Sequence, residues 1–217
     1  MIAVCKDIPF FCIHLMSEKV REPFMIHFQN HLGRQIQTFP ALIGKDIAGP
    51  DYPRRHPHEA ETSLGNIGCT ESHIRLLQKL LEEQWPAIGI FEDDAEAMKS
   101  AEEIQAFVDS ADRADPSWDI LLLGASEWVE SKQQTPELIR VNRFWGTHAV
   151  LVKQHVAQKV IDTHRKLLEK GFAYPADWLY AQTIKDFGLI AYGPVGCKSL
   201  IRQKPGLISA INGKVRT

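Results

Sequence analysis

The stretch 65-GNIGCTESHIRLLQKLLEEQWPAIGIFEDDAE-96 decides how the rest of the chain can fold. Its first part is a glycine-flanked turn, and the apolar residues that follow recur at helical spacing. Thr70 can cap a helix that begins at Glu71, and Pro86 ends that helix. Residues 87–91 are too short and too apolar for anything but an interior strand. The stretch therefore predicts a helix followed by a buried strand.

Three consecutive acids, Glu92, Asp93 and Asp94, stand at the carboxyl end of that strand. Three carboxylates share a small volume only if a cation, a proton or open water offsets their repulsion. The end of a strand in an open α/β sheet is also where such folds bind ligands. Oxygen ligands suit Mn(II) or Mg(II). We expect these acids to hold a divalent metal that holds a phosphate; the alternative is a solvated strand end.

Composition bounds the class of protein. With 217 residues, 44% hydrophobic and 24% charged, the chain fits one domain over residues 1–217 of ordinary globular character. Its net charge of −2 argues against a generic nucleic-acid binder. No apolar run reaches the roughly 18 residues that span a bilayer, and no signal peptide is visible. The four cysteines include no CxxC pair, which indicates a reducing compartment, and we expect a cytoplasmic protein.

The remaining elements alternate between strand and helix. This pattern predicts an α/β sandwich with a mostly parallel central sheet flanked by helices. Residues 43–64 are rich in glycine, proline and charge and read as a solvated loop, or as one that contacts phosphate or acceptor. A capping box at Ser100 and Glu103 opens another helix, and residues 126–140 read as a polar loop. Further elements are predicted as strands at 9–15, 36–42, 119–124, 146–152 and 189–192, and helices from Glu22 to Gly33, over 154–170 and from Pro175.

Two segments offer sites for an anion. Ser72 and His73 lie in the first turn of the expected helix, where free N–H groups and the helix dipole favour negative charge. The alternative for His73 is a satisfied helix-start histidine. Residues 196–217 hold five basic residues and no acid. They read as a poorly ordered tail, as a diphosphate site through Arg202 and Lys204, or as a contact with an anionic membrane surface.

The motifs, taken together, resemble glycosyltransferase family 25, the group of bacterial lipooligosaccharide galactosyltransferases and collagen galactosyltransferase domains. The resemblance runs from about Phe10 to Ser209 and is carried by FPALIGKDI, GCTESH, EDD, GTHA, PADW and QKPGLIS. It implies a GT-A-type nucleotide-sugar-binding fold and an inverting transfer that uses Mn(II). The donor would be a UDP-hexose, galactose being favoured, and the acceptor a saccharide, such as a lipid-linked lipooligosaccharide. Neither the hexose nor the oligomeric state can be read from the sequence.

The resemblance also implies roles for single residues. A metal bridging both phosphates offsets the charge of the leaving diphosphate. On an extended chain Glu92 and Asp94 face one way and Asp93 the other, so we expect Asp94 to ligate the metal. Glu92 would then face the ribose or a metal-bound water, and Asp93 would support them or ligate after a local bend.

Asp177, at a helix start in PADW, is our candidate base for the acceptor hydroxyl. Its alternatives are metal coordination and helix capping. Trp178 is a candidate platform for an acceptor sugar, or a core residue. His14 stands where relatives have an asparagine, which puts the usual donor contact in doubt, and Arg21 is the basic counterpart that follows. By family position the other donor-binding candidates are Gly146, Thr147 and His148, with Gln203 and Lys204 closing over the diphosphate.

Two other function classes remain open at this point. Clustered acids at a sheet edge also serve metal-dependent phosphohydrolases, for which Asp177 and His148 would be recruits. The other class is a catalytically inactive module that binds a glycan or a nucleotide. The intact acidic triplet argues against this second class, whereas His14 argues for it.

Overall fold

A computed structural model describes residues 8–49, 52 and 64–207 of the chain. Its strands are β1 (Phe10–His14), β2 (Gln37–Pro40), β3 (Ala87–Glu92), β4 (Ala95–Ala97), β5 (Ile120–Gly124), β6 (Glu127–Gln133), β7 (Leu138–Trp145), β8 (Ala149–Lys153), β9 (Ala191–Pro194) and β10 (Ile201–Gln203). Its helices are the 3-10 turn η2 (Lys19–Arg21), α1 (Glu22–Leu32), α2 (Gly44–Ile47), α3 (Leu64–Glu82), α4 (Ala101–Ala114), α5 (Gln154–Glu169) and α6 (Ala176–Phe187). The chain has the expected α/β architecture.

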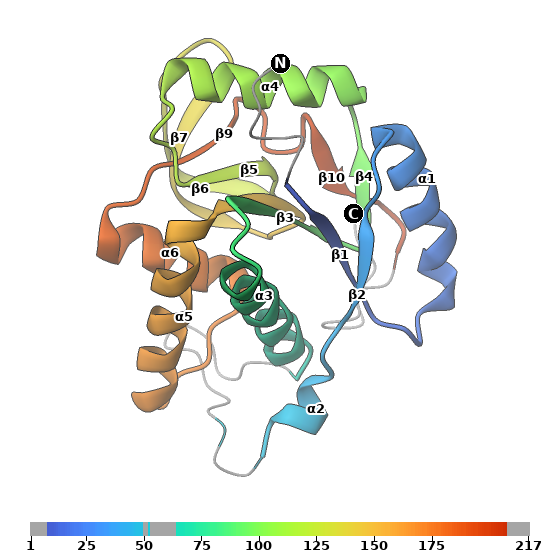
Figure 1. Cartoon of the computed structure of the whole chain (residues 1–217), viewed down its shortest axis with the longest axis vertical. Coiled ribbons are helices and arrows are strands. Elements are labelled where there is room, and N and C mark those ends of the chain that lie inside the picture. Colours follow the sequence, from blue (N-terminus) through green and yellow to red (C-terminus); the bar gives the residue numbers. More distant parts are fainter. Residues whose placement is uncertain (1–7, 50–51, 53–63, 208–217) are drawn as a thin grey trace.

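The central sheet is mixed rather than mostly parallel. Eight strands lie in the order β2-β1-β3-β8-β5-β9-β7-β6, and β10 pairs with β4 in a separate ribbon (Figure 1). The pairs β1–β2, β1–β3 and β5–β9 are parallel, whereas β3–β8, β5–β8, β7–β9 and β6–β7 are antiparallel. No helix separates β5, β6, β7 and β8 along the chain. Parallel neighbours need a crossover of a dozen or more residues, so the tight β6–β7 connection has to be antiparallel.

Alternate residues of each central strand enter two different cores. One core packs the sheet against α3, α5 and α6, and the other packs it against α4 and α1 (Figure 1). In β3, Ile88 and Ile90 belong to the first core and Phe91 to the second. Because side chains alternate along a strand, Glu92 follows on the α3 side of the sheet and Asp93 on the α1 side. The sheet therefore separates neighbouring acids.

Helix α3 begins two turns earlier than the sequence predicts. It starts at Leu64, not at Glu71, so Thr70 is no cap; its hydroxyl donates to the Tyr174 carbonyl at 2.9 Å. The segment that leads into α2 packs directly on this part of the helix. It lies so close that a Cβ on Gly68 would be 2.3 Å from the Leu42 carbonyl oxygen. The close contact of α2 and α3 thus outweighs the low helix propensity of the GNIGC segment.

The polar segment predicted as a loop over 126–140 is largely the β6–β7 hairpin. The sequence did not predict β6 as a strand, because β6 is exposed along nearly all its length. It therefore lacks the alternation of apolar and polar residues that marks a half-buried strand. Other predictions are confirmed: Gly33 ends α1 with a φ of 56°, and Ser100 and Glu103 form the capping box of α4. Among the described residues, no helix combines the length and apolarity that crossing a bilayer requires.

Candidate active site

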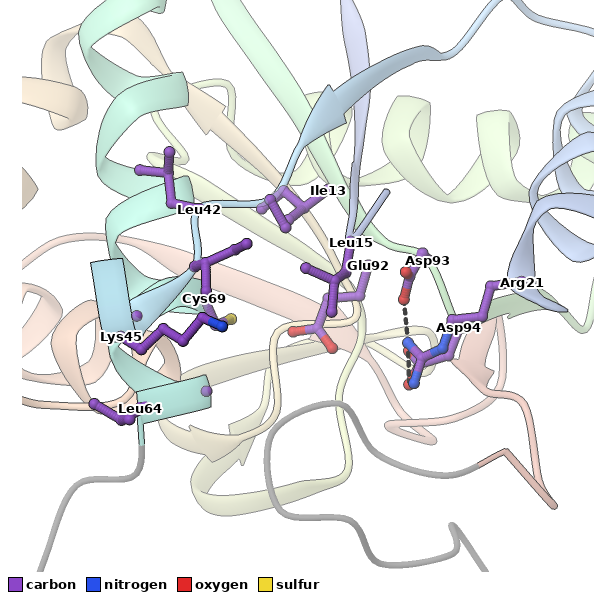
Figure 2. Close-up of a pocket in the computed structure, with 14 residues that line it drawn as sticks. Ile13, Leu15, Arg21, Leu42, Lys45, Leu64, Cys69, Glu92, Asp93 and Asp94 are labelled. Carbon is purple, nitrogen blue, oxygen red and sulfur yellow. Dashed lines mark hydrogen bonds and ion pairs between the residues drawn. The ribbon is translucent and has the colours of Figure 1, made fainter. Parts of the chain in front are cut away.

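Two cavities meet at the carboxyl end of β3. The first, of about 250 Å³, lies between α2, the start of α3 and the acidic residues after β3 (Figure 2). The second, of about 200 Å³, is bounded by the residues before β8 and the start of α6. Cys69 and Glu92 line both cavities. These two side chains therefore stand at the boundary between the two spaces.

Asp93 belongs to a buried charge network on the α1 side of the sheet. Its carboxylate forms an ion pair with the Arg21 guanidinium and accepts a hydrogen bond of 2.8 Å from His14 Nδ1. Figure 2 shows Asp93 and Asp94 pointing toward Arg21, with Glu92 apart from them. Burial alone would lower the pKa of Arg21, but the Asp93 carboxylate outweighs it and raises that pKa. His14 and Arg21, predicted as donor contacts, therefore both bind Asp93.

Asp94 lies in the turn after β3, which ends the strand alternation. A carboxylate oxygen is 3.8 Å from the Arg21 guanidinium, and the same oxygen accepts from Gln203 Nε2 at 3.3 Å. Asp94 is thus brought to the side of Asp93, whereas the extended chain predicted it on the side of Glu92. The Lys204 ammonium binds Glu96 at 2.7 Å, and Arg202 binds the same carboxylate. Arg202 and Lys204, which the sequence predicted to contact a diphosphate, are therefore both paired with Glu96.

The second cavity joins Glu92 to Asp177. The Thr147 hydroxyl donates to Glu92 Oε1 at 3.0 Å. The Gly146 N–H donates to Asp177 Oδ2 at 2.7 Å, which fixes the start of α6 against the residues before β8. Gly146 has a φ of 76°, and a Cβ there would lie 2.6 Å from His148, so both conformation and space require glycine. Asp177 is therefore bound by Gly146, one of the residues predicted to face the donor sugar.

Aromatic residues form one end of this cavity. The Trp145 and Trp178 rings lie 5.1 Å apart, and the Arg143 guanidinium is 4.2 Å from the Trp178 ring. Trp145 lines the cavity, and Trp178 is not among its lining residues. His148 is buried with Nε2 3.3 Å from the Ser126 hydroxyl. The indole exposed to a ligand here is that of Trp145, which the sequence did not single out.

Ser72 and His73 lie inside α3 and not in its first turn, so they do not form the predicted anion site. The Ser72 hydroxyl donates to the Gly68 carbonyl at 2.7 Å within the helix. His73 is 1% exposed, and burial lowers its pKa to about 4, so the imidazole is neutral at pH 7. Burial, followed by the charges of Glu92 and Asp177, raises the pKa of the Cys69 thiol.

Sequence reasoning overlooked two residues of the first cavity and could not be tested on some others. Lys45, from α2, and Cys69 both line the first cavity. The sequence offered little indication of either residue. Lys45 falls in the segment predicted as a glycine-rich loop, and Cys69 is recognisable only as a helical neighbour of His73, four residues away. Predictions for the loop over 53–63, and for Lys214 and Arg216, fall outside the described residues.

One family matches most of the chain. The sequence model of Glycosyltransferase family 25 (LPS biosynthesis protein) matches residues 7–179. A "Glycosyltransferase 25 family member" of Drosophila pseudoobscura pseudoobscura is 30% identical over 95 residues, which are 39% of this chain and 15% of that relative. The chain thus matches a small part of the length of this curated relative.

Two solved structures align with most of this chain at low sequence identity. A glycosyltransferase involved in the glycosylation of the major capsid of PBCV-1 has a TM-score of 0.49 and 12% identity, over 92% of this chain and 93% of that one. A Drosophila β-1,4-galactosyltransferase 7 complexed with manganese, UDP-Gal and xylobiose has a TM-score of 0.42 and 13% identity, over 89% of this chain and 68% of that one.

Proposed function

Because the chain belongs to glycosyltransferase family 25, we propose that it transfers a hexose from a UDP-sugar to a saccharide acceptor by an inverting reaction. The observation that carries this proposal is the position of Glu92. This carboxylate lines both the cavity beside the acidic turn and the cavity that holds Asp177. A donor bound across it would have its nucleotide in one space and its sugar in the other.

The first cavity has the chemistry that a uridine diphosphate requires. Leu15 and Leu42 supply apolar surface for a flat pyrimidine, and Lys45 supplies a positive charge for phosphate (Figure 2). Glu92 and Asp94 supply oxygen atoms at the same wall. This combination favours a nucleotide sugar over an uncharged ligand.

The donor set at that wall fits Mn(II) or Mg(II). Asp94 is the principal candidate ligand, with Glu92 as a further oxygen donor. Asp93 is the weakest candidate, because Arg21 already neutralises it. A bound divalent ion would offset the charge that develops on the leaving diphosphate.

Asp177 is the proposed base for the acceptor hydroxyl. The Gly146 N–H donates to Asp177 Oδ2 and the Trp178 N–H donates to Oδ1, which orients the carboxylate. Because a carboxylate has about four lone-pair sites, these two bonds leave capacity to accept a proton. Trp145 would supply the apolar surface on which an acceptor sugar stacks. Galactose as the hexose and a lipid-linked oligosaccharide as the acceptor follow from the family resemblance and form part of this proposal.

Calorimetric titration of UDP into the purified chain tests the proposal. We expect binding in the presence of Mn(II) that is lost with EDTA, and transfer from a UDP-hexose to a saccharide in the next step. Absence of UDP binding under both conditions would refute the donor assignment. Metal-dependent UDP binding with release of free sugar or phosphate and no transfer would instead favour a hydrolase.

A further inference from the structure

We propose that Cys69, His73 and Glu92 form a binding site for Zn(II), distinct in its chemistry from the oxygen site for Mn(II). Among the described residues, these three are the group of His, Cys, Asp and Glu whose ligand atoms lie within 4.8 Å of one another. Cys69 and His73 are four residues apart on α3 and share one face of that helix. Glu92 reaches the same point from the end of β3, on the α3 side of the sheet.

The state of His73 points to a ligand. Its ring is 1% exposed, and its Nε2 has no hydrogen-bond partner among the described residues. A buried polar atom without a partner destabilises the fold, and a bound metal would satisfy it. Nδ1 lies 3.3 Å from the hydroxyl of buried Tyr180. With the proton on Nδ1 and donated to Tyr180, the Nε2 lone pair is left to coordinate, as in metal sites whose histidine is oriented by a second partner.

The three donor types select the metal. A thiolate, an imidazole and a carboxylate are the ligand types of zinc sites, with bonds of about 2.0–2.3 Å, whereas Mn(II) and Mg(II) prefer oxygen alone. With such bonds, tetrahedral ligand atoms lie roughly 3.3–3.8 Å apart, so separations of up to 4.8 Å would have to shorten by about 1 Å on binding. Zinc would displace the Cys69 proton to solvent. Since Cys69 and Glu92 line both cavities, a water molecule or ligand in either space would be the source of a fourth zinc ligand.

A zinc ion bound here would be ligated by the Glu92 carboxylate, which could then no longer ligate Mn(II) in the oxygen site. We therefore expect Zn(II) to lower Mn(II)-dependent UDP binding, and replacing Cys69 with serine to relieve that inhibition. This consequence rests on the proposed function, whereas zinc binding itself does not. The two can fail separately, because the binding test below needs neither nucleotide nor sugar.

The test uses Co(II) as a spectroscopic substitute for zinc in the metal-free full chain. We expect a near-ultraviolet thiolate-to-cobalt band that saturates at one ion per chain and disappears when Zn(II) is added. Cys69→Ser should abolish the band, while Cys197→Ser, which changes a thiol outside the group, should keep it. Tyr180→Phe should weaken zinc binding about 10- to 100-fold, because the hydroxyl that orients the His73 ring is lost. A wild-type chain without the band, or a Cys69→Ser chain that retains it, would overturn the proposal.

Discussion

Replacing Asp93 with asparagine separates two roles that the acidic turn allows for this residue. Asp93 is 7% exposed, and its ion-pair partner Arg21 is 4% exposed. If the carboxylate exists to neutralise Arg21, its loss leaves the buried guanidinium with only the longer contact to Asp94, at 3.8 Å, as a described ion pair. If it exists to ligate a metal, its loss removes one of three neighbouring negative charges and changes ligand binding instead.

The magnitude follows from burial. Removing one partner of a buried ion pair costs about 3–5 kcal/mol, because the remaining charge stays desolvated. For a chain of 217 residues each kcal/mol lowers the melting temperature by roughly 2–4 °C. We therefore expect Asp93→Asn to melt about 6–20 °C below the wild type. Removing both charges, in Arg21→Met with Asp93→Asn, should cost less than either single change, because neither charge of the Arg21–Asp93 pair is then left buried without the other.

Urea and thermal unfolding, followed by circular dichroism, measure this effect. The matched control is Glu83→Gln, which breaks the exposed pair that Glu83 forms with Lys79 at 3.2 Å. Exposed helical pairs contribute roughly 0.2–0.5 kcal/mol, so the control should be nearly unchanged. An Asp93→Asn chain as stable as the control, but without Mn(II)-dependent UDP binding, would refute the structural role and make Asp93 a ligand.

Three further predictions concern the other acids. Asp94→Asn should reduce Mn(II)-dependent UDP affinity in calorimetry without the stability loss of the Asp93 variant; unchanged affinity would remove Asp94 from the metal site. Asp177→Asn keeps one acceptor oxygen for the N–H groups of Gly146 and Trp178 and removes the basic carboxylate, so it should retain UDP affinity and lose about 10²- to 10⁴-fold in transfer rate. Equal loss of UDP affinity in both variants would make Asp177 a metal ligand. Hydrogen bonds from Ser117 and Tyr192 lower the pKa of Asp115, so its contribution to stability is complete above its ordinary pKa of 3.8 and is lost as the pH falls below that value. Asp115→Asn should therefore flatten the acid limb of the unfolding free energy in a series of urea titrations, and an unchanged limb would contradict this.

Much of the fold follows from local sequence patterns. Continuous apolar runs mark β1, β3 and β5 because these strands are buried on both faces of the sheet. The stop at Gly33 and the capping box at Ser100 are read directly, since each depends on a residue and its immediate neighbours. The same local rule placed Glu92 and Asp93 on opposite faces of the sheet.

Other features depend on partners that are distant in sequence. The first turns of α3 form in a glycine-rich segment because α2 packs closely against them at Gly68. The strand directions and the β6–β7 hairpin were missed because polar, exposed strands lack the alternation that identifies buried ones.

The candidate site likewise combines features that follow from local sequence with contacts between residues distant in sequence. An acidic turn after a buried strand can be read from the sequence, because the strand signal and the charges are contiguous. The pairing of Asp93 with Arg21, 72 residues away, and the approach of Glu92 to Cys69 and His73 depend on how the chain folds. The physical reason is that side-chain alternation sets the face on which each acid lies, whereas its partners are set by how α1 and α3 pack on those two faces.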